Sequence, residues 1–151
     1  MRARSTNPAV FKSRPVLHVC SSKRSINELV ESSKRLVRGG DVLLLFRYDE
    51  RLVRRVLPAY VNAALRFGEG SSRSNSMQVE MLLFLCGTMN IGKALRECGA
   101  ADSKRFCVFS SSAALFSRFS KANGIVSTRR IPVSLDPKVS GNVAISELLS
   151  D

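Results

Sequence analysis

The sequence contains no tryptophan, a single histidine and four cysteines, and it has no long apolar segment. Its longest uninterrupted apolar run covers residues 81–86, whereas a membrane span needs roughly 18 residues. The cysteines form no Cys-x-x-Cys pair and His18 lies in an apolar stretch, so the clustered donors that zinc requires are missing from the pattern. We therefore expect no metal, no cofactor and no contact with a membrane.

Catalytic patterns are equally scarce. There is no Gly-x-Ser-x-Gly nucleophile turn and no pair of carboxylates at a workable spacing, and His18 is the only imidazole. Glu80 is the one charged residue of the segment 77–86, where a carboxylate is more often paired with an arginine or with backbone groups than used in catalysis. The sequence therefore predicts a protein that is not an enzyme and has no catalytic residue.

Acidic residues are half as numerous as basic ones. Lysine and arginine total 24 against 12 aspartates and glutamates, which gives a net charge of +12 and a pI near 10.5. A polyanionic partner is the leading implication, either a nucleic acid or an acidic protein surface. The alternative is a solvated basic surface that only aids solubility.

The first acidic residue is Glu28, so the chain begins with a basic segment. Its composition is similar to that of an organellar targeting peptide, but Pro8 and Pro15 interrupt the amphipathic helix that such a peptide needs. We expect a flexible basic arm at 1–14 and a single domain at 15–151. Each cysteine lies in an apolar segment and no secretory signal is present, which indicates reduced thiols and a cytoplasmic location, nuclear as well in a eukaryote.

Hydrophobic periodicity predicts strands alternating with helices. A capping box of Ser25 and Glu28 opens the first helix, and Pro58 is expected to kink or restart the helix that contains it. The expected strands cover 16–20, 41–46, 106–109 and 125–131, and the expected helices cover 26–38, 50–67, 77–86, 90–98, 112–121 and 143–149. The fold class is a single mixed α/β domain, with a small mixed sheet covered by helices and a central, buried helical hairpin.

Residues 87–94 read Gly-Thr-Met-Asn-Ile-Gly-Lys-Ala and fit the phosphate-binding pattern G-x-x-x-x-G-K. Ala94 stands where that loop needs Ser or Thr to hold magnesium, and the preceding segment is helical in pattern, whereas the loop normally follows a strand. A tight turn between two helices is favoured. A small nucleotide-binding protein that uses the loop from Gly87 to Lys93 remains an alternative.

Arginines cluster along one predicted helix and around the Gly/Ser-rich segment that follows it. Arg47, Arg51, Arg54 and Arg55 fall within a turn or two of helix, so that several phosphates could be contacted at once. Arg66 and Arg73 lie on either side of the Gly/Ser-rich segment and are expected to be largely exposed. The alternative for the whole group is a solvated helix face.

The order of motifs between residues 63 and 99 resembles one known family. An alanine-rich helix precedes a small loop with a basic residue and serines, an acidic residue opens an apolar helix, and a glycine, an Ile-x-x-Ala-Leu helix and a final glycine follow. The residues that carry this pattern are Ala63, Ala64, Arg66, Arg73, Ser76, Glu80, Gly87, Asn90, Ile91, Ala94, Leu95 and Gly99. The chain is similar here to the kinase-binding accessory subunit of the KEOPS (EKC) complex, and the resemblance extends over residues 15–131.

The resemblance implies a non-catalytic role. Such a subunit binds the small atypical kinase of its complex and helps to hold tRNA, including the single-stranded 3′ CCA end, while the complex adds threonylcarbamoyl to the adenosine next to the anticodon. Together with the arginine clusters, it predicts RNA-binding residues at Arg51, Arg54, Arg55, Arg66, Arg73 and Ser76, and structural residues of the family pattern at Glu80, Gly87, Asn90, Ile91, Ala94 and Gly99. A separate apolar helix face is expected to dock on the kinase. A generic basic RNA-binding domain without a kinase partner is the second alternative.

Overall fold

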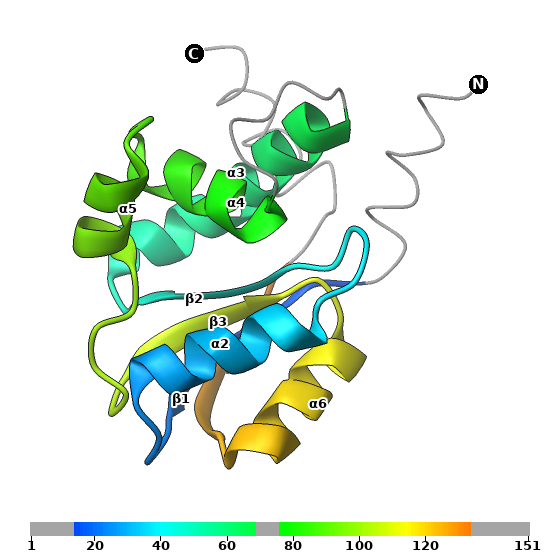
Figure 1. The fold of residues 1–151 in the computed structure, drawn as a ribbon, viewed down its shortest axis with the longest axis vertical. Helices are drawn as coiled ribbons and strands as arrows, with labels where there is room; N and C mark the ends of the chain where they lie inside the picture. The colour runs from blue at the N-terminus through cyan, green and yellow to red at the C-terminus, as the bar shows by residue number, and fades with distance from the viewer. Residues whose placement is uncertain (1–13, 69–75, 134–151) are drawn as a thin grey trace.

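The computed structural model describes residues 14–68 and 76–133 (Figure 1). The elements of this part, in chain order, are β1 (Val16–Ser21), α2 (Ile26–Leu36), β2 (Leu43–Arg47), α3 (Glu50–Gly68), α4 (Met77–Cys86), α5 (Ile91–Cys98), β3 (Phe106–Ser110), α6 (Ala113–Asn123) and β4 (Val126–Ile131). Residues 1–13 of the predicted arm, Arg73 and the helix predicted at 143–149 lie outside the described residues.

The four strands form one sheet in the order β2-β3-β1-β4. Every pair of neighbours is antiparallel, where the sequence predicted a mixed sheet. The reason is topological: β3 lies between β1 and β2 and runs opposite to both, and β4 runs opposite to β1, so no parallel pair of strands becomes adjacent. The predicted class, a single α/β domain with a small sheet covered by helices, is confirmed. Of the predicted buried hairpin, α4 is buried, whereas α5 is largely exposed.

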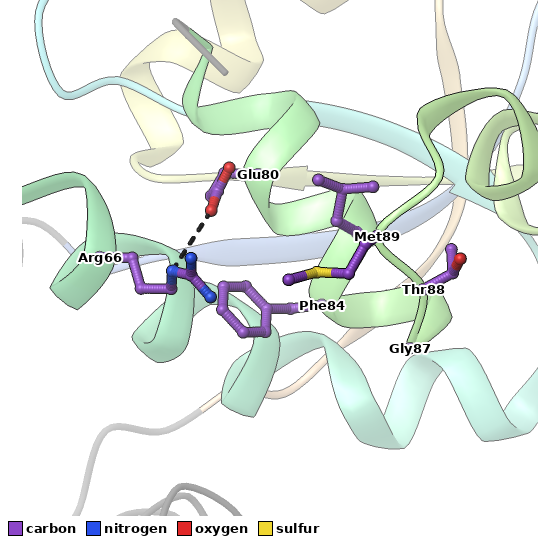
Figure 2. Close-up of a pocket in the computed structure, with 7 residues that line it drawn as sticks. Arg66, Glu80, Phe84, Gly87, Thr88 and Met89 are labelled. Carbon is purple, nitrogen blue, oxygen red and sulfur yellow. Dashed lines mark ion pairs between the residues drawn. The ribbon is translucent and has the colours of Figure 1, made fainter. Parts of the chain in front are cut away.

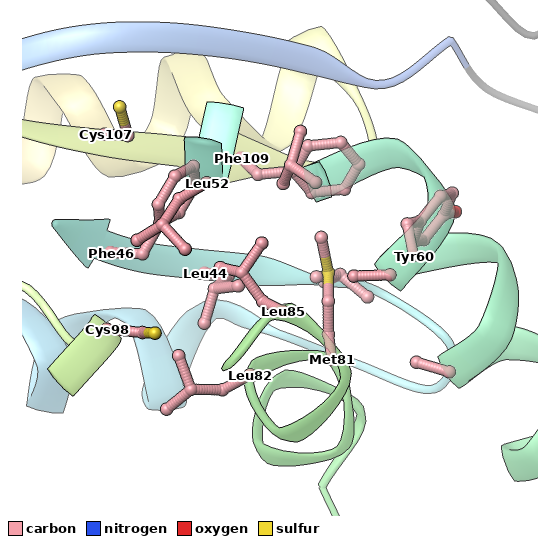
Figure 3. Close-up of a cluster of buried hydrophobic side chains, with 14 of the residues drawn as sticks. Leu44, Phe46, Leu52, Tyr60, Met81, Leu82, Leu85, Cys98, Cys107 and Phe109 are labelled. Atoms are coloured by element: carbon pink, nitrogen blue, oxygen red, sulfur yellow. The ribbon is translucent and has the colours of Figure 1, made fainter. Parts of the chain in front are cut away.

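Helices cover both faces of the sheet. Helices α3, α4 and α5 lie on one face, and α2 and α6 lie on the other (Figure 1). Each face has its own apolar core, and alternate residues of a strand point into different cores. Cys107 and Phe109 of β3 join the core under α3–α5 (Figure 3). Phe106 and Val108 of the same strand join the core under α2 and α6. The continuous apolar run of β2 is buried for the same reason.

Local capping signals set most helix ends. Ser25 and Glu28 form the predicted capping box of α2, and Gly87 ends α4 in the left-handed conformation with φ 74°. Helix α3 does not restart at Pro58, because it is continuous from Glu50 to Gly68. Proline removes only one helical N–H, and buried residues on both sides of it, such as Val56 and Tyr60, hold the two halves against the same core.

Helix α5 departs from the expected pattern of burial. Ile91, Ala94, Leu95 and Cys98 follow the i, i+3, i+4, i+7 spacing that predicts a buried apolar stripe, but only Ala94 and Cys98 are buried. Ile91 is 42% exposed and Leu95 is 56% exposed. The helix contacts the end of the domain chiefly through α4, so it has one narrow buried side and leaves the rest of its apolar surface in solvent.

His18 lies on the side of the sheet that α2 and α6 cover. Its ring stacks on Phe116 of α6, with ring centres 4.0 Å apart, and its Nδ1 lies 2.7 Å from the Ser127 hydroxyl. Burial lowers the pKa of His18 below its ordinary value, and the positive charge of Arg130, its partner across the β1–β4 pair, lowers that pKa further. The neutral imidazole is therefore the form that the fold favours.

This environment predicts a pH dependence of stability. The unfolded chain takes up a proton on His18 near its ordinary pKa of about 6.5, at a higher pH than the folded chain does. The stabilising contribution is therefore fully present above about pH 6.5 and is lost as the pH falls below that value. Urea unfolding of the wild type and of His18→Phe, measured from pH 7.5 downward, should show a shallower decline for the variant. Parallel curves for the two proteins would rule out this role of His18.

Candidate functional site

The arginines of α3 divide into two groups. Arg51, Arg54 and Arg55 are exposed near the start of the helix, whereas Arg66 is half-buried near its end. Arg55 and Arg66 are about 16 Å apart along the helix axis, given a rise of about 1.5 Å per residue. The structure therefore does not join all the predicted arginines in one groove, and the two groups have different surroundings.

The first group borders a hollow that we call the arginine pocket. It has a volume of about 410 Å³ and lies where the end of β2, the start of α3 and the ends of α4 and α5 meet. Four arginines and two carboxylates line it, which leaves an excess of two positive charges. The lining residues are Arg47, Asp49, Arg51, Leu52, Arg55, Cys86, Arg96, Glu97 and Cys98. Arg54 is exposed on the same helix but does not line the pocket.

Two arginines of the pocket donate to backbone carbonyls at helix ends. Arg47 donates from Nη2 to the carbonyl of Arg96 over 3.0 Å, and Arg55 donates from Nη1 to the carbonyl of Leu85 over 3.4 Å. Both carbonyls belong to the last turn of a helix, where a positive charge offsets the negative end of the helix dipole. A guanidinium has five N–H donors, so each of these contacts leaves donors for a further acceptor.

The pKa values of an acidic group and of a thiol in the pocket are shifted in opposite directions. Hydrogen bonds from Arg51 lower the pKa of Asp49, which keeps this carboxylate ionised beside its arginine at an Nη2–Oδ2 distance of 3.3 Å. Burial raises the pKa of the Cys98 thiol to about 12, and its contact with the Cys86 thiol adds to the rise. A thiol with this pKa is protonated at neutral pH and is a poor nucleophile. Thiolate chemistry at Cys98 is therefore disfavoured, whereas the guanidinium groups of the pocket can bind an anion.

Arg66 belongs to a second hollow, of about 200 Å³, at the junction of α3, α4 and the turn that follows α4 (Figure 2). Its Nε lies 3.6 Å from Oε1 of Glu80, and the side chains of Arg66 and Glu80 are 33% and 2% exposed. The guanidinium also lies 5.5 Å from the centre of the Phe84 ring. The prediction that Arg66 is largely exposed is wrong, because its guanidinium neutralises a carboxylate that the apolar helix α4 has buried. Its contact with RNA stays a prediction. The predicted pairing of Glu80 with an arginine is confirmed.

Two polar residues of the family pattern cap helices. Ser76 is the N-cap of α4 and its hydroxyl accepts a hydrogen bond from the amide of Val79, so its predicted contact with RNA has no support from this geometry. Asn90 is the N-cap of α5 and its Oδ1 accepts from the amide of Lys93 over 2.9 Å. These residues begin the two helices of the α4–α5 hairpin.

Three further residues of the family pattern are small, and their positions require small side chains or a glycine backbone. Ala94 is fully buried on the inner side of α5, and Gly87 forms the left-handed turn that ends α4. At Gly99 a Cβ atom would lie 2.5 Å from the carbonyl oxygen of Leu95, so a larger residue would displace the end of α5. Ile91, by contrast, is exposed, and its place in the pattern has no packing explanation in the described residues.

The loop from Gly87 to Lys93 connects two helices, as the sequence favoured. A phosphate loop needs free amides at the N-terminus of its helix, but the side chain of Asn90 already accepts from the amide of Lys93. The geometry therefore does not support the alternative of a nucleotide site at this turn.

Comparison of the chain with protein-family models and with curated protein sequences gives no match in either. Among residues 14–68 and 76–133, no group of three or more His, Cys, Asp and Glu side chains could hold a metal ion. In the same part of the chain, no helix combines the length and the apolar character needed to cross a membrane.

Sequence reasoning identified Arg47, Arg51 and Arg55 but missed Arg96 as a member of the same pocket. Arg96 is in the last turn of a short helix, and only the packing of α5 against α4 brings it to the start of α3. The available signal was its position near a helix C-terminus, where a cation is favoured whatever the function. From spacing along the chain alone, an arginine that stabilises a helix C-terminus cannot be distinguished from one that binds a ligand.

The contact between Arg66 and Glu80 predicts a stability effect. Arg66→Met keeps most of the apolar stem and removes the charge beside a buried carboxylate, so it should lower the free energy of unfolding by about 1–3 kcal/mol. Arg54→Met, on the exposed side of the same helix, should change it by less than about 0.5 kcal/mol. The double variant Arg66→Met/Glu80→Gln should recover part of the loss in urea denaturation. A stability of Arg66→Met equal to that of Arg54→Met would contradict the assigned role.

Proposed function

We propose that the chain is a non-catalytic accessory protein that binds tRNA through the arginine pocket and docks on a protein kinase, as the KEOPS kinase-binding subunit that it resembles does. The observation that carries this proposal is the convergence of Arg47, Arg51, Arg55 and Arg96, from three separate elements, on a single hollow. An excess of positive charge in a concave site favours an anionic ligand.

The chemistry of the pocket suits a phosphodiester backbone. Guanidinium groups bind phosphate oxygens through pairs of parallel N–H donors. Phosphate contacts supply most of the affinity of proteins for RNA, and they tolerate different sequences. Backbone recognition is the mode expected of a protein that holds many tRNAs for a separate catalytic subunit.

The surface proposed for the kinase is the exposed apolar part of α5 and of the turn before it. Met89 is 58% exposed, and Ile91 and Leu95 are also in solvent. Apolar side chains grouped on a surface are typical of an interface core that charged residues surround. This apolar patch, defined by Met89, Ile91 and Leu95, supports the assignment to a protein partner rather than to RNA.

The RNA-binding part of the proposal predicts a change in salt dependence. Arg51→Gln and Arg96→Gln should each weaken tRNA binding and lower the slope of log K against log salt by about 0.7 to 0.9 for each phosphate that the variant no longer binds. The matched control is Arg118→Gln, which removes the same charge from the exposed side of α6 across the sheet. Filter binding or anisotropy with labelled tRNA, measured over a series of salt concentrations, gives the slopes. Slopes equal to that of Arg118→Gln would remove the pocket from the proposal.

The same assay distinguishes how tRNA is held. A tRNA trimmed of its four 3′-terminal nucleotides should bind more weakly than the intact molecule if the single-stranded end is contacted. Equal affinity would assign the pocket to the duplex backbone instead.

The partner-binding part predicts that the apolar patch is needed for co-purification. Leu95→Glu should abolish recovery of a stoichiometric kinase with the tagged chain, because a charge would be buried in the interface. Val126→Glu is the control, since Val126 is an equally exposed apolar residue on the distant edge strand β4. Recovery of no kinase with the wild type, together with intact tRNA binding, would favour the generic RNA-binding domain.

A further inference from the structure

Tyr48 is the centre of a second arginine cluster that sequence reasoning did not predict. It directly follows β2 and stands between Arg47 and Asp49, both of which line the arginine pocket. The guanidinium carbon of Arg105 lies over the Tyr48 ring, 4.2 Å from its centre. Arg129 donates from Nη1 to the Tyr48 hydroxyl over 3.4 Å, and that hydroxyl donates to Oε2 of Glu50 over 3.0 Å.

The topology of the sheet explains why these distant residues meet. Phe46, Cys107, Val19 and Arg129 form one row across the four strands, so their side chains point to the same face. Phe46, Cys107 and Val19 belong to the core under α3–α5, and Tyr48 packs against the same core. Arg129 therefore extends toward Tyr48 over the buried side chains of the row.

Arg105 reaches the same place from the start of β3. It immediately precedes Phe106, the first residue of that strand. The charges of both Arg105 and Arg129 act on the buried thiol of Cys107, whose pKa burial raises to about 12. Both guanidinium groups therefore lie near Cys107 of that row.

Neither of these two arginines has an obvious structural task. Both side chains are exposed, and within residues 14–68 and 76–133 no carboxylate lies within 4.0 Å of either guanidinium. A cation that only stabilised the fold would normally gain an acidic partner or a helix end. Here the partner of both arginines is an aromatic residue, which fixes their positions without neutralising their charge.

We propose that Arg105, supported by Tyr48, is a stacking platform for one base of single-stranded RNA, and that Arg129 binds a phosphate next to that base. This inference rests on the proposed function and extends it, because the platform adjoins the arginine pocket through Arg47 and Asp49. A single strand that crosses from the pocket to the platform would have its backbone held in the first and a base held on the second.

The chemistry favours a nucleotide over an acidic peptide. The Arg105 guanidinium carbon lies 4.2 Å from the centre of the Tyr48 ring, and the exposed side chain leaves room for a second planar group. Bases of single-stranded RNA stack on arginine planes as well as on aromatic rings. A carboxylate of a peptide would need only the charge and would gain nothing from a flat surface.

The decisive variant is Arg105→Lys, which keeps the charge and removes the plane. With a labelled single-stranded RNA of mixed sequence, Arg105→Lys should bind roughly fivefold to a hundredfold more weakly than the wild type, with an unchanged salt slope. The two proteins should bind an abasic strand of the same length equally. Arg118→Lys on α6 is the matched control and should behave as the wild type with both strands.

Variants of the tyrosine test the support of the platform. Tyr48→Leu should weaken binding of the mixed-sequence strand, and Tyr48→Phe should restore most of it because the ring under Arg105 is retained. Arg129→Gln should lower the salt slope by about 0.7, the value for one phosphate bound on a single strand.

The outcomes separate this inference from the proposed function. If Arg51→Gln and Arg96→Gln weaken binding but Arg105→Lys binds the mixed-sequence strand as the wild type does, the platform is wrong and the pocket stands. If the pocket variants also bind normally, the proposed function fails. If Arg105→Lys loses affinity equally for the abasic strand, or if polyglutamate competes as well as RNA does, the site recognises charge alone and the stacking proposal is overturned.

Discussion

Helix α4 has apolar side chains on every side, and its burial between α3, α5 and β2 constrains one whole face of the molecule. Burying a side chain of the size of leucine or methionine contributes about 1.5–3 kcal/mol each, so the position of this helix is strongly determined. Its burial carries one carboxylate, Glu80, into the core, and Arg66 of α3 compensates for it. The left-handed turn at Gly87 then directs α5 back across the end of the domain. The arginine pocket is the space that this arrangement leaves between the helix ends and β2.

The arginines of the pocket combine two roles that are physically compatible. Carbonyls in the last turns of α4 and α5 attract cations, and Arg55 and Arg47 satisfy them. The donors of lysine all lie on one compact ammonium group, whereas the five N–H donors of arginine are spread over a planar fork. Arginine is therefore better suited to bind a carbonyl and a phosphate at the same time. The guanidinium groups are thereby fixed before any ligand arrives, which reduces the entropy lost on binding. The excess of arginine over lysine in the sequence has a structural reason at this site.

Local signals in the sequence predict the elements well because they depend on neighbouring residues. The capping box at Ser25, the glycine at 87 and the periodic apolar positions all act within a few residues. The order of the strands depends instead on β3 entering between β1 and β2, which no local pattern records. The exposure of Ile91 and Leu95 was missed for a related reason, since periodicity shows which side of a helix is apolar but not how much of that side the domain covers. The contact of Arg129 with Tyr48 joins residues 81 positions apart and follows only from the register of the sheet.

Helix α5 connects the two surfaces that the proposed function requires. Leu95 belongs to the apolar patch and Arg96, the next residue, lines the arginine pocket. Successive residues of a helix are rotated by about 100° around its axis, so the side chains of Leu95 and Arg96 lie on adjacent faces of α5. The helix is held to the domain through Ala94 and Cys98 and little else that is buried. A protein that covered Leu95 would restrict the motion of α5 and with it the position of the Arg96 guanidinium. Docking of a partner and binding of RNA would then stabilise the same placement of one helix, and by linkage each would raise the affinity for the other.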